Sequence, residues 1–329
     1  MIIICAFQIY IKNGNCTNCK INSIIIERKY SQEKLCPSCY VKNIEEIINN
    51  TISKYRLFKP KDKIIVALSG GKDSTALLYN LIKFYKKISH SEPLIALTID
   101  EGIRGYRENS IKIAKEFCAK HNINHSIISF KKEFGKSLDE IMDIKRELKG
   151  PTRYTCYYCA LIRRRLLNDH AKKLGGTVLA MGHNLTDLAE TFLMNILYKR
   201  FKLISSQFFL KKENPTINQY FIKKVSPLMQ IPEEEIYLYI NLNKINYYAS
   251  HCKYREEDPI VRKRVLNFIE DCKNIIPDIE FNLFNGFLEL SERLYIKYRT
   301  YKYNFCHICG YPTYNNKICS YCNLYEEFT

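Results

Sequence analysis

Cysteine is the residue type whose spacing in this chain points most directly to chemistry. Eight of the fourteen cysteines fall into two sets near the chain ends, and each set consists of two CxxC pairs. The sets are Cys16, Cys19, Cys36 and Cys39, and then Cys306, Cys309, Cys319 and Cys322. This arrangement is typical of a zinc ribbon, where four thiolates hold one ion and leave no position for a substrate. We therefore predict two structural Zn²⁺ sites.

A third CxxC pair, Cys156 and Cys159, has no second pair nearby in the sequence. Such a pair can be redox-active, can hold part of an iron–sulfur cluster, or can consist of packed thiols. Arg163, Arg164 and Arg165 follow on a predicted helix over 160–174. We expect these cations to lower the pKa of a nearby thiol and to attract a phosphate backbone. The residue types alone leave the three interpretations open.

The segment 69–74, Ser-Gly-Gly-Lys-Asp-Ser, has the composition of a phosphate-binding loop. It follows an apolar run over 64–68 and precedes an amphipathic run over 75–87, which predicts a strand, a glycine turn and a helix. The glycines let backbone amides approach an anion, and Lys72 adds a full positive charge. The spacing differs from the Walker A loop, so ordinary γ-phosphate transfer is not implied. The predicted nucleotide-binding residues here are Ala67, Leu68, Ser69, Gly70, Gly71, Lys72, Asp73 and Ser74.

The elements around this loop alternate between strand and helix. We expect strands over 94–99, 125–130 and 177–181, with helices between them, and a largely helical region from about residue 231. This order predicts an α/β fold with a doubly wound parallel sheet, in which ligands bind at the carboxyl edge. Asp100 ends one strand and could contact ribose or a metal, or close a turn. Asp187 opens a helix and could be a ligand or an N-cap.

Length and composition bound the remaining possibilities. The 329 residues are 46% hydrophobic and 26% charged, which is enough to form a folded core. We predict a zinc ribbon over 1–43, a catalytic domain with a linking helix over 44–300, and a second ribbon over 301–329. The net charge of +17 indicates a polyanionic partner, with nucleic acid first, although abundant Ile, Lys, Asn and Tyr make part of it compositional. The sequence has no stretch typical of a membrane span, and we expect a cytoplasmic protein without a membrane partner.

Several motifs taken together resemble a known family. The loop is similar to the PP-loop, SGGxDS, whose proteins bind ATP and cleave it between the α and β phosphates. Four other segments match motifs of one branch of these proteins. They are Lys34-Leu35-Cys36, the run 99–107 that contains Asp-Glu-Gly-Ile and Gly-Tyr-Arg, the lone CxxC with Arg163-Arg164, and Gly182-His183-Asn184 with Asp187. This combination resembles the archaeal and eukaryotic cytoplasmic tRNA 2-thiolation enzymes, over nearly the whole chain.

The resemblance implies the adenine nucleotide alpha hydrolase (PP-loop) fold and a reaction. ATP would adenylate the C2 oxygen of a tRNA uridine, and a sulfur would then displace AMP. The implied catalytic residues are Cys156, Cys159, Cys252, Asp187 and Arg163, and the three cysteines would hold a [4Fe-4S] cluster or act through a persulfide. ATP and Mg²⁺ would be bound by the loop, Asp100, Asp187, Gly182 and His183. One position departs from the family, because Thr186 replaces the first acid of Asn-x-Asp-Asp.

The resemblance also implies partners and leaves alternatives. The partners would be tRNA, a sulfur donor (sulfide or a ubiquitin-like thiocarboxylate carrier) and a second copy in a homodimer. The first ribbon ends in Cys39 rather than His, which favours the wobble uridine over the T-loop uridine. The rivals are T-loop uridine or cytidine 2-thiolation, lysidine synthesis, which needs no cysteine site, and a non-catalytic zinc-ribbon tRNA-binding protein, supported only by Thr186.

Overall fold

A five-stranded parallel sheet forms the centre of the computed structural model, which describes residues 12–86, 92–147, 154–207, 219–254, 260–298, 304–313 and 317–328. The strand order is β7-β6-β5-β8-β9. The strands are β5 (Ile64–Ala67), β6 (Ile95–Asp100), β7 (Asn124–Ser129), β8 (Val178–Ala180) and β9 (Lys223–Val225). The doubly wound α/β prediction is therefore confirmed. Strand β9 was not predicted, because two of its three residues are lysines.

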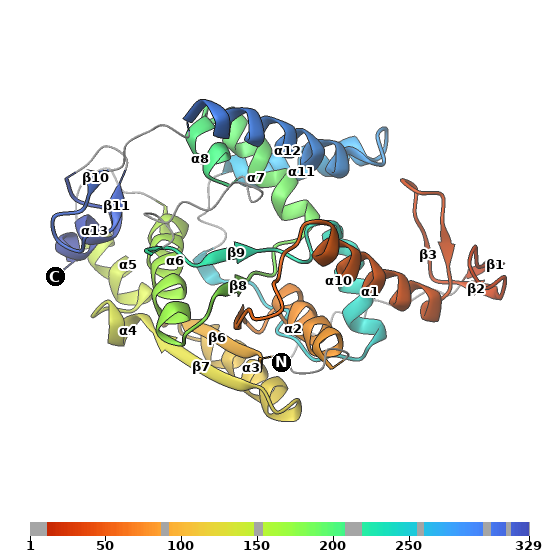
Figure 1. Cartoon of the computed structure of the whole chain (residues 1–329), viewed down its shortest axis with the longest axis horizontal. Coiled ribbons are helices and arrows are strands. Elements are labelled where there is room, and N and C mark those ends of the chain that lie inside the picture. The colour runs from red at the N-terminus through yellow and green to blue at the C-terminus, as the bar shows by residue number, and fades with distance from the viewer. Residues whose placement is uncertain are drawn as a thin grey trace.

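Helices cover both faces of the sheet (Figure 1). Side chains alternate along β5, so Ile64 and Val66 belong to one hydrophobic core and Ile65 belongs to the other. The first core includes α1 (Pro37–Lys54), α2 (Lys72–Tyr85), α3 (Arg107–Lys120) and α10 (Glu233–Leu242). The second includes α4 (Phe130–Glu133), α5 (Leu138–Glu147) and α6 (Thr155–Lys173). This two-layer burial explains why β5 is a continuous apolar run.

The later helices form a group at the top of Figure 1. These are α7 (Leu185–Leu197), α8 (Phe201–Ser206), α11 (Ile260–Lys273) and α12 (Ile279–Tyr298). A small core of Ala189, Val265 and Ile269 joins α7 to α11. Helix α7 follows β8, so this group is attached directly to the carboxyl edge of the sheet. No helix of the described ranges is long and apolar enough to cross a lipid bilayer.

The two cysteine-rich ends lie on opposite sides of the molecule in Figure 1. The first contains β1 (Lys12–Asn15), β2 (Asn22–Ile24), β3 (Ile26–Glu27) and β4 (Lys34–Leu35). The second contains β10 (Asn304–Phe305), β11 (Pro312–Thr313) and α13 (Ser320–Phe328). Helix α1 runs across the predicted boundary at 43/44, and the boundary at 300/301 lies outside the described residues. The domain limits stay a prediction.

Candidate functional site

The phosphate loop connects β5 to α2 at the carboxyl edge of the sheet. Gly70 has φ +83°, and a Cβ there would lie 2.2 Å from the carbonyl oxygen of Ser110, so only glycine fits. The Lys72 ammonium contacts Asp73 at 2.9 Å and Glu233 of α10 at 2.5 Å. Burial acts to lower the pKa of Lys72, but these two carboxylates outweigh it and raise that pKa. The loop therefore has the cation and the helix start that an anion site requires.

The segment after β8 packs directly on this loop. A Cβ on Gly182 would lie only 3.0 Å from the backbone nitrogen of Ser74, so a side chain there would have to push the loop backbone away, and glycine favours the close approach. Asn184 donates from Nδ2 to Asp73 at 3.1 Å. Asn184 is also the N-cap of α7, in a capping box with Asp187. Gly182 and Asp187 are thus beside the loop. The N-cap prediction for Asp187 was wrong, because Asn184 is the N-cap and Asp187 is the third residue of the helix, where its carboxylate accepts from the Asn184 backbone N–H at 3.2 Å.

Carboxylates gather around Lys72. Burial first, and then the charges of Asp73 and Glu233, raise the pKa of Asp187 to about 6. A divalent cation between Asp73 and Asp187 would relieve this repulsion, and carboxylate oxygens are the ligands that Mg²⁺ prefers. The residues present therefore fit a magnesium ion bound together with phosphates.

Thr186, the departure from the family pattern, contacts α10 and α12. Its hydroxyl accepts a hydrogen bond at 3.0 Å from the backbone N–H of Glu233 and interacts with the buried carboxyl of Glu280 on α12. An acid at position 186 would place a second carboxylate beside Glu280. The threonine therefore suits the contact with α10 and α12. Asp73, Asp187 and Glu233 still surround Lys72 although position 186 is not an acid.

Three of the six cysteines outside the ribbons, Cys156, Cys159 and Cys252, were predicted to form the sulfur site. Cys156 and Cys159 are in the first turn of α6, and Cys252 lies in the loop before residue 254. Cys159 and Cys252 pack against the same core and interact electrostatically with each other and with Glu101. In the described chain their Sγ atoms do not form a group within 4.8 Å, unlike the two ribbon sets. Cys252 nevertheless lies near Cys159, as two ligands of one multi-iron cluster would.

The thiol pKa prediction was wrong for Cys159. Burial raises its pKa to about 12, and the opposing effect of Arg163 is smaller. The Arg163 guanidinium lies 3.9 Å from the Cys159 sulfur and 3.4 Å from Glu101, so part of its charge is already balanced. Sequence spacing placed the arginine correctly but could not show how deeply the thiol is enclosed.

A chain of charged groups joins the phosphate loop to the cysteines. Arg107 donates to the Ser69 carbonyl at 3.1 Å and contacts Glu101 at 2.6 Å. Glu101 then contacts Arg163, which lies against Cys159. Both Arg107 and Glu101 are buried, so removing either one would leave the other as a buried, unpaired charge at high energetic cost. We call this series, Ser69–Arg107–Glu101–Arg163, the charged link.

Sequence reasoning missed four residues of this site. They are Glu101, Arg107, Asn184 and Glu233. The first three lie within the motif segments, but a motif does not say which side chains meet across the sheet edge. Glu233 lies on α10, and its only sequence signal is the acidic start of that helix.

The other predicted site residues either border the surface at the sheet edge or support the backbone of the loop. The Asp100 carboxylate accepts from the Gly102 backbone at 2.9 Å and borders a hollow along α3, so a turn role is present. Leu68 is buried and extends the β5 pairing through its backbone, while Ala67 ends the strand. His183 is exposed, but desolvation by the protein around it and then four nearby cations lower its pKa to about 4, so its imidazole is neutral at neutral pH.

Each ribbon brings its four cysteines together as predicted. In both sets the sulfur atoms all lie within 4.8 Å of one another. Cys36 donates its backbone N–H to the Cys16 sulfur at 3.4 Å, and Cys322 does so to Cys319 at 3.5 Å. Such N–H donors stabilise thiolates, and the four-sulfur geometry fits a zinc ion.

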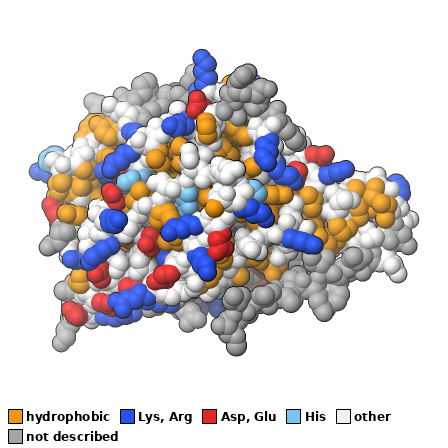
Figure 2. All heavy atoms as spheres, turned by 90° about the horizontal axis from the view of Figure 1, so that it is seen from below, with side chains coloured by type: hydrophobic (Ala, Val, Ile, Leu, Met, Phe, Trp, Pro, Cys, Tyr) orange, Lys and Arg blue, Asp and Glu red, His pale blue; other side chains and the backbone are white. Residues whose placement is uncertain are grey.

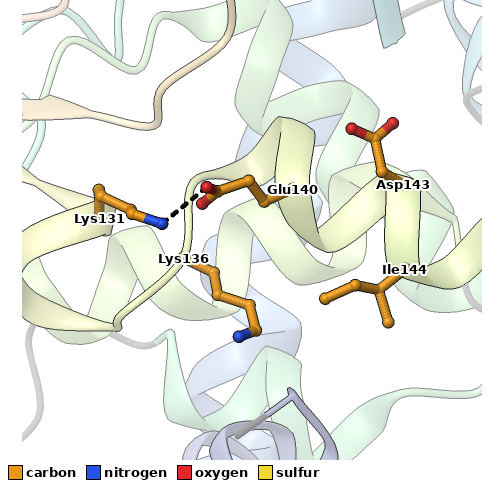
Figure 3. Close-up of a pocket in the computed structure, with 5 residues that line it drawn as sticks. All are labelled: Lys131, Lys136, Glu140, Asp143 and Ile144. Atoms are coloured by element: carbon orange, nitrogen blue, oxygen red, sulfur yellow. Dashed lines mark hydrogen bonds and ion pairs between the residues drawn. The ribbon is translucent and has the colours of Figure 1, made fainter.

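A shallow hollow on α4 and α5 lies apart from this chemistry (Figure 3). It is lined by Lys131, Lys136, Glu140, Asp143 and Ile144, and Lys131 pairs with Glu140 at 2.6 Å. None of the predicted site residues belongs to either helix, so we assign it no part in the site.

Comparison with known proteins agrees with this geometry. The PP-loop domain family matches residues 39–269. A probable sulfurtransferase of Methanocaldococcus jannaschii is 36% identical, over 91% of this chain and 85% of the relative. Cytoplasmic tRNA 2-thiolation protein 1 of Saccharomyces cerevisiae (strain S288c) is 32% identical, over 94% and 85%. The solved U34-tRNA thiolase NcsA from Methanococcus maripaludis, with its [4Fe-4S] cluster, superposes with a TM-score of 0.79 at 29% identity, covering 95% of each chain.

The fold and the loop define the class of PP-loop proteins, and the relatives narrow it. This chain belongs to the PP-loop family and, within it, to the group that contains the tRNA 2-thiolation proteins.

Proposed function

We propose that this protein is an ATP-dependent tRNA sulfurtransferase that replaces the C2 oxygen of the wobble uridine with sulfur. One observation carries the proposal: a PP-loop and a three-cysteine site meet at one sheet edge and are joined by the charged link. The reaction needs both halves, because one activates the oxygen and the other supplies sulfur. The relatives named for tRNA 2-thiolation support tRNA as substrate and the cytoplasm as location.

The phosphate half would activate the base. The loop amides and Lys72 would bind the phosphates of ATP, with Mg²⁺ held by Asp73 and Asp187 and ribose contacted from Asp100. The uridine C2 oxygen attacks the α-phosphorus, and the bond to pyrophosphate breaks. The adenylated oxygen then leaves as AMP when sulfur attacks C2. Neutral His183 and Gly182 would line the space between nucleotide and base.

The cysteine half would hold the sulfur. Cys156, Cys159 and Cys252 would hold a [4Fe-4S] cluster with one iron open, because Cys156 and Cys159 lie near the start of α6, Cys252 packs against the same core as Cys159, and α6 presents its positive N-terminal end. When bound, this cluster would supply a soft site for sulfide. Arg163 would offset negative charge at Cys159, and its ion pair with Glu101 would hold the guanidinium in place. The donor would be sulfide or a thiocarboxylate on a ubiquitin-like carrier.

The remaining assignments are structural. Each ribbon would hold one Zn²⁺, giving two per chain. The family resemblance implies a homodimer, and we infer one here. The zinc and homodimer assignments are independent of the proposed reaction, so either could be wrong while the reaction stands.

Two measurements test the proposal. Pyrophosphate release from ATP should require tRNA and should disappear in Lys72→Met, which would exclude a purely RNA-binding protein. Iron and sulfide in anaerobically purified protein should fall to background in Cys156→Ala. Cys272→Ala, a change to a cysteine on α11, is the matched control and should retain both. Full iron content and full thiolation in Cys156→Ala would refute the cysteine assignment.

A further inference from the structure

A group of cations lies where the two halves of the site meet. Arg163 and Arg164 come from α6, Lys224 from β9 and Arg262 from α11. Strand pairing places Leu179 opposite Lys224, and Met181 donates its N–H to Val225 at 2.8 Å, so the turn that contains His183 leaves the sheet beside Lys224. All four cations act on His183 and help to keep it neutral.

Two of these cations are balanced by carboxylates. Arg262 makes two contacts with Glu190 of α7, at 2.8 and 3.0 Å. Arg163 contacts Glu101. Each of these arginines therefore has a partner within the protein.

The other two cations are not balanced in this way. Arg164 and Lys224 are exposed and form no ion pair with any residue that the structure describes. Although both are exposed, protein around them partly desolvates each charge. This desolvation, with Arg163 and Arg262, lowers the pKa of Arg164; desolvation and Arg164 lower that of Lys224, whose attraction to Asp169 is weaker. Both side chains therefore have a surface open to solvent, although protein surrounds the rest of each, and each lies close to other cations. An anion would relieve this repulsion.

The position favours an anion of the nucleic acid over one of ATP. ATP phosphates already have Lys72, the loop amides and the start of α2. Arg164 is instead next to Arg163 on α6, the helix that carries Cys156 and Cys159. Elsewhere, on the face in Figure 2, Lys and Arg are spread among Asp and Glu, so the overall charge does not by itself identify a contact.

We propose that Arg164 and Lys224 bind a backbone phosphate of the tRNA next to the uridine that is modified. The inference rests on the proposed function, because it assumes that a tRNA base enters between the phosphate loop and the cysteines. A phosphate at this position fixes the strand, and thereby the base, without reading its sequence.

The test is tRNA binding as a function of salt. The probe is an unmodified tRNA transcript with uridine at the wobble position, bound to the full chain without ATP. The double variant Arg164→Ala/Lys224→Ala is compared with Lys120→Ala/Lys132→Ala, which removes two exposed lysines from α3 and α4. Both variants lose the same charge. ATP-dependent pyrophosphate release and thiolation are measured on the same preparations.

We expect the first variant to weaken binding at least tenfold at moderate salt and to reduce the slope of log K against log salt by about one to two. The control should change neither by more than about twofold. The KM for ATP should stay unchanged in both. Equal behaviour of the two variants, or a raised KM for ATP with normal tRNA binding, would overturn the inference.

The same measurements separate a wrong phosphate site from a wrong proposed function. If the wild-type chain thiolates tRNA while the Arg164/Lys224 variant matches the control, only the phosphate site is wrong. If the wild-type chain neither thiolates tRNA nor releases pyrophosphate with it, the proposed function is wrong, and the phosphate site falls with it.

Discussion

The two ribbons have the same set of ligands but are attached to the protein in different ways. Cys16 and Cys36 of the first ribbon belong to the main hydrophobic core, together with α1 and β5. Its Arg28 is buried and makes two-pronged contacts with Glu235 of α10, the closest at 2.6 Å. Tyr40 donates to the Glu235 carbonyl at 2.6 Å. Two residues earlier, Glu233 holds Lys72 of the phosphate loop.

The second ribbon has a core of its own and attaches to α6. Cys306, Cys319 and Cys322 form a small separate cluster. Arg165 of α6 donates to the Cys309 sulfur at 3.6 Å and stacks on Tyr311, with its guanidinium carbon 3.4 Å from the ring centroid. Leu324 and Phe328 of α13 pack into the core beneath α6. This ribbon therefore supports the helix that carries Cys156 and Cys159.

The two modes of attachment indicate that each ribbon supports a different part of the site. The first ribbon is continuous with the core and fixes the phosphate half, whereas the second is an attached unit that fixes the cysteine half. The charged link joins the two. Damage to either ribbon should therefore affect a different part of the reaction.

The largest expected effect comes from removing one proposed zinc ligand at equivalent positions in the two ribbons. Cys36→Ser should lose one zinc and destabilise the catalytic domain by more than about 5 kcal/mol, because its thiol is part of the main core. Cys319→Ser should also lose one zinc, at less than half that cost. Zinc content and urea unfolding check this. Equal destabilisation by the two variants would remove the proposed contrast.

The next effect concerns the ion pairs that attach each ribbon. Arg28 and Glu235 are both 2% exposed, so Arg28→Met leaves a buried unpaired carboxylate and should cost about 3–5 kcal/mol. Arg165 and Asp169 are 16% and 25% exposed, so Arg165→Met should cost only about 1 kcal/mol.

These two variants should also differ in kinetics. We expect Arg28→Met to raise the KM for ATP, and Arg165→Met to slow thiolation with the KM for ATP unchanged. Steady-state kinetics of pyrophosphate release and of thiolation separate the two. The comparison fails if Arg165→Met alters ATP binding while Arg28→Met does not.

The charged link should matter less for stability than for coupling. Glu101→Gln keeps the shape but removes the charge between Arg107 and Arg163. We expect thiolation to fall about tenfold to a hundredfold, because the activated base and the sulfur lose their alignment. Pyrophosphate release should fall much less. Glu116→Gln, on the exposed side of α3, should have no effect, and a parallel loss of both activities in Glu101→Gln would argue against a coupling role.

The smallest expected effect is at Glu233. This carboxylate is 46% exposed and pairs with Lys72, so in the proposed site it would compete with ATP, and Glu233→Gln should lower the KM for ATP by about twofold to fivefold. The matched control is Glu234→Gln on the same helix. A large increase in KM would instead mean that Glu233 contacts the bound nucleotide or its metal.

The sequence predicted the local features of the site well. The phosphate loop and its flanking elements follow from a continuous apolar run, a glycine turn and an amphipathic run, all close in sequence. The charged link could not be predicted, because Glu101 and Arg163 are 62 positions apart and meet only through the sheet. The raised pKa of Cys159 was missed for the same reason, since burial depends on packing. The role of Thr186 required α10 and α12 to be placed.

The most direct test of the central claim is mass spectrometry of tRNA nucleosides after an anaerobic reaction with ATP, Mg²⁺ and sulfide. The wild-type chain should form 2-thiouridine at the wobble position, with one AMP for each sulfur inserted. Lys72→Met should stop both products, and Cys156→Ala should stop 2-thiouridine. Formation of 2-thiouridine without ATP, or in Cys156→Ala at the wild-type rate, would contradict the account.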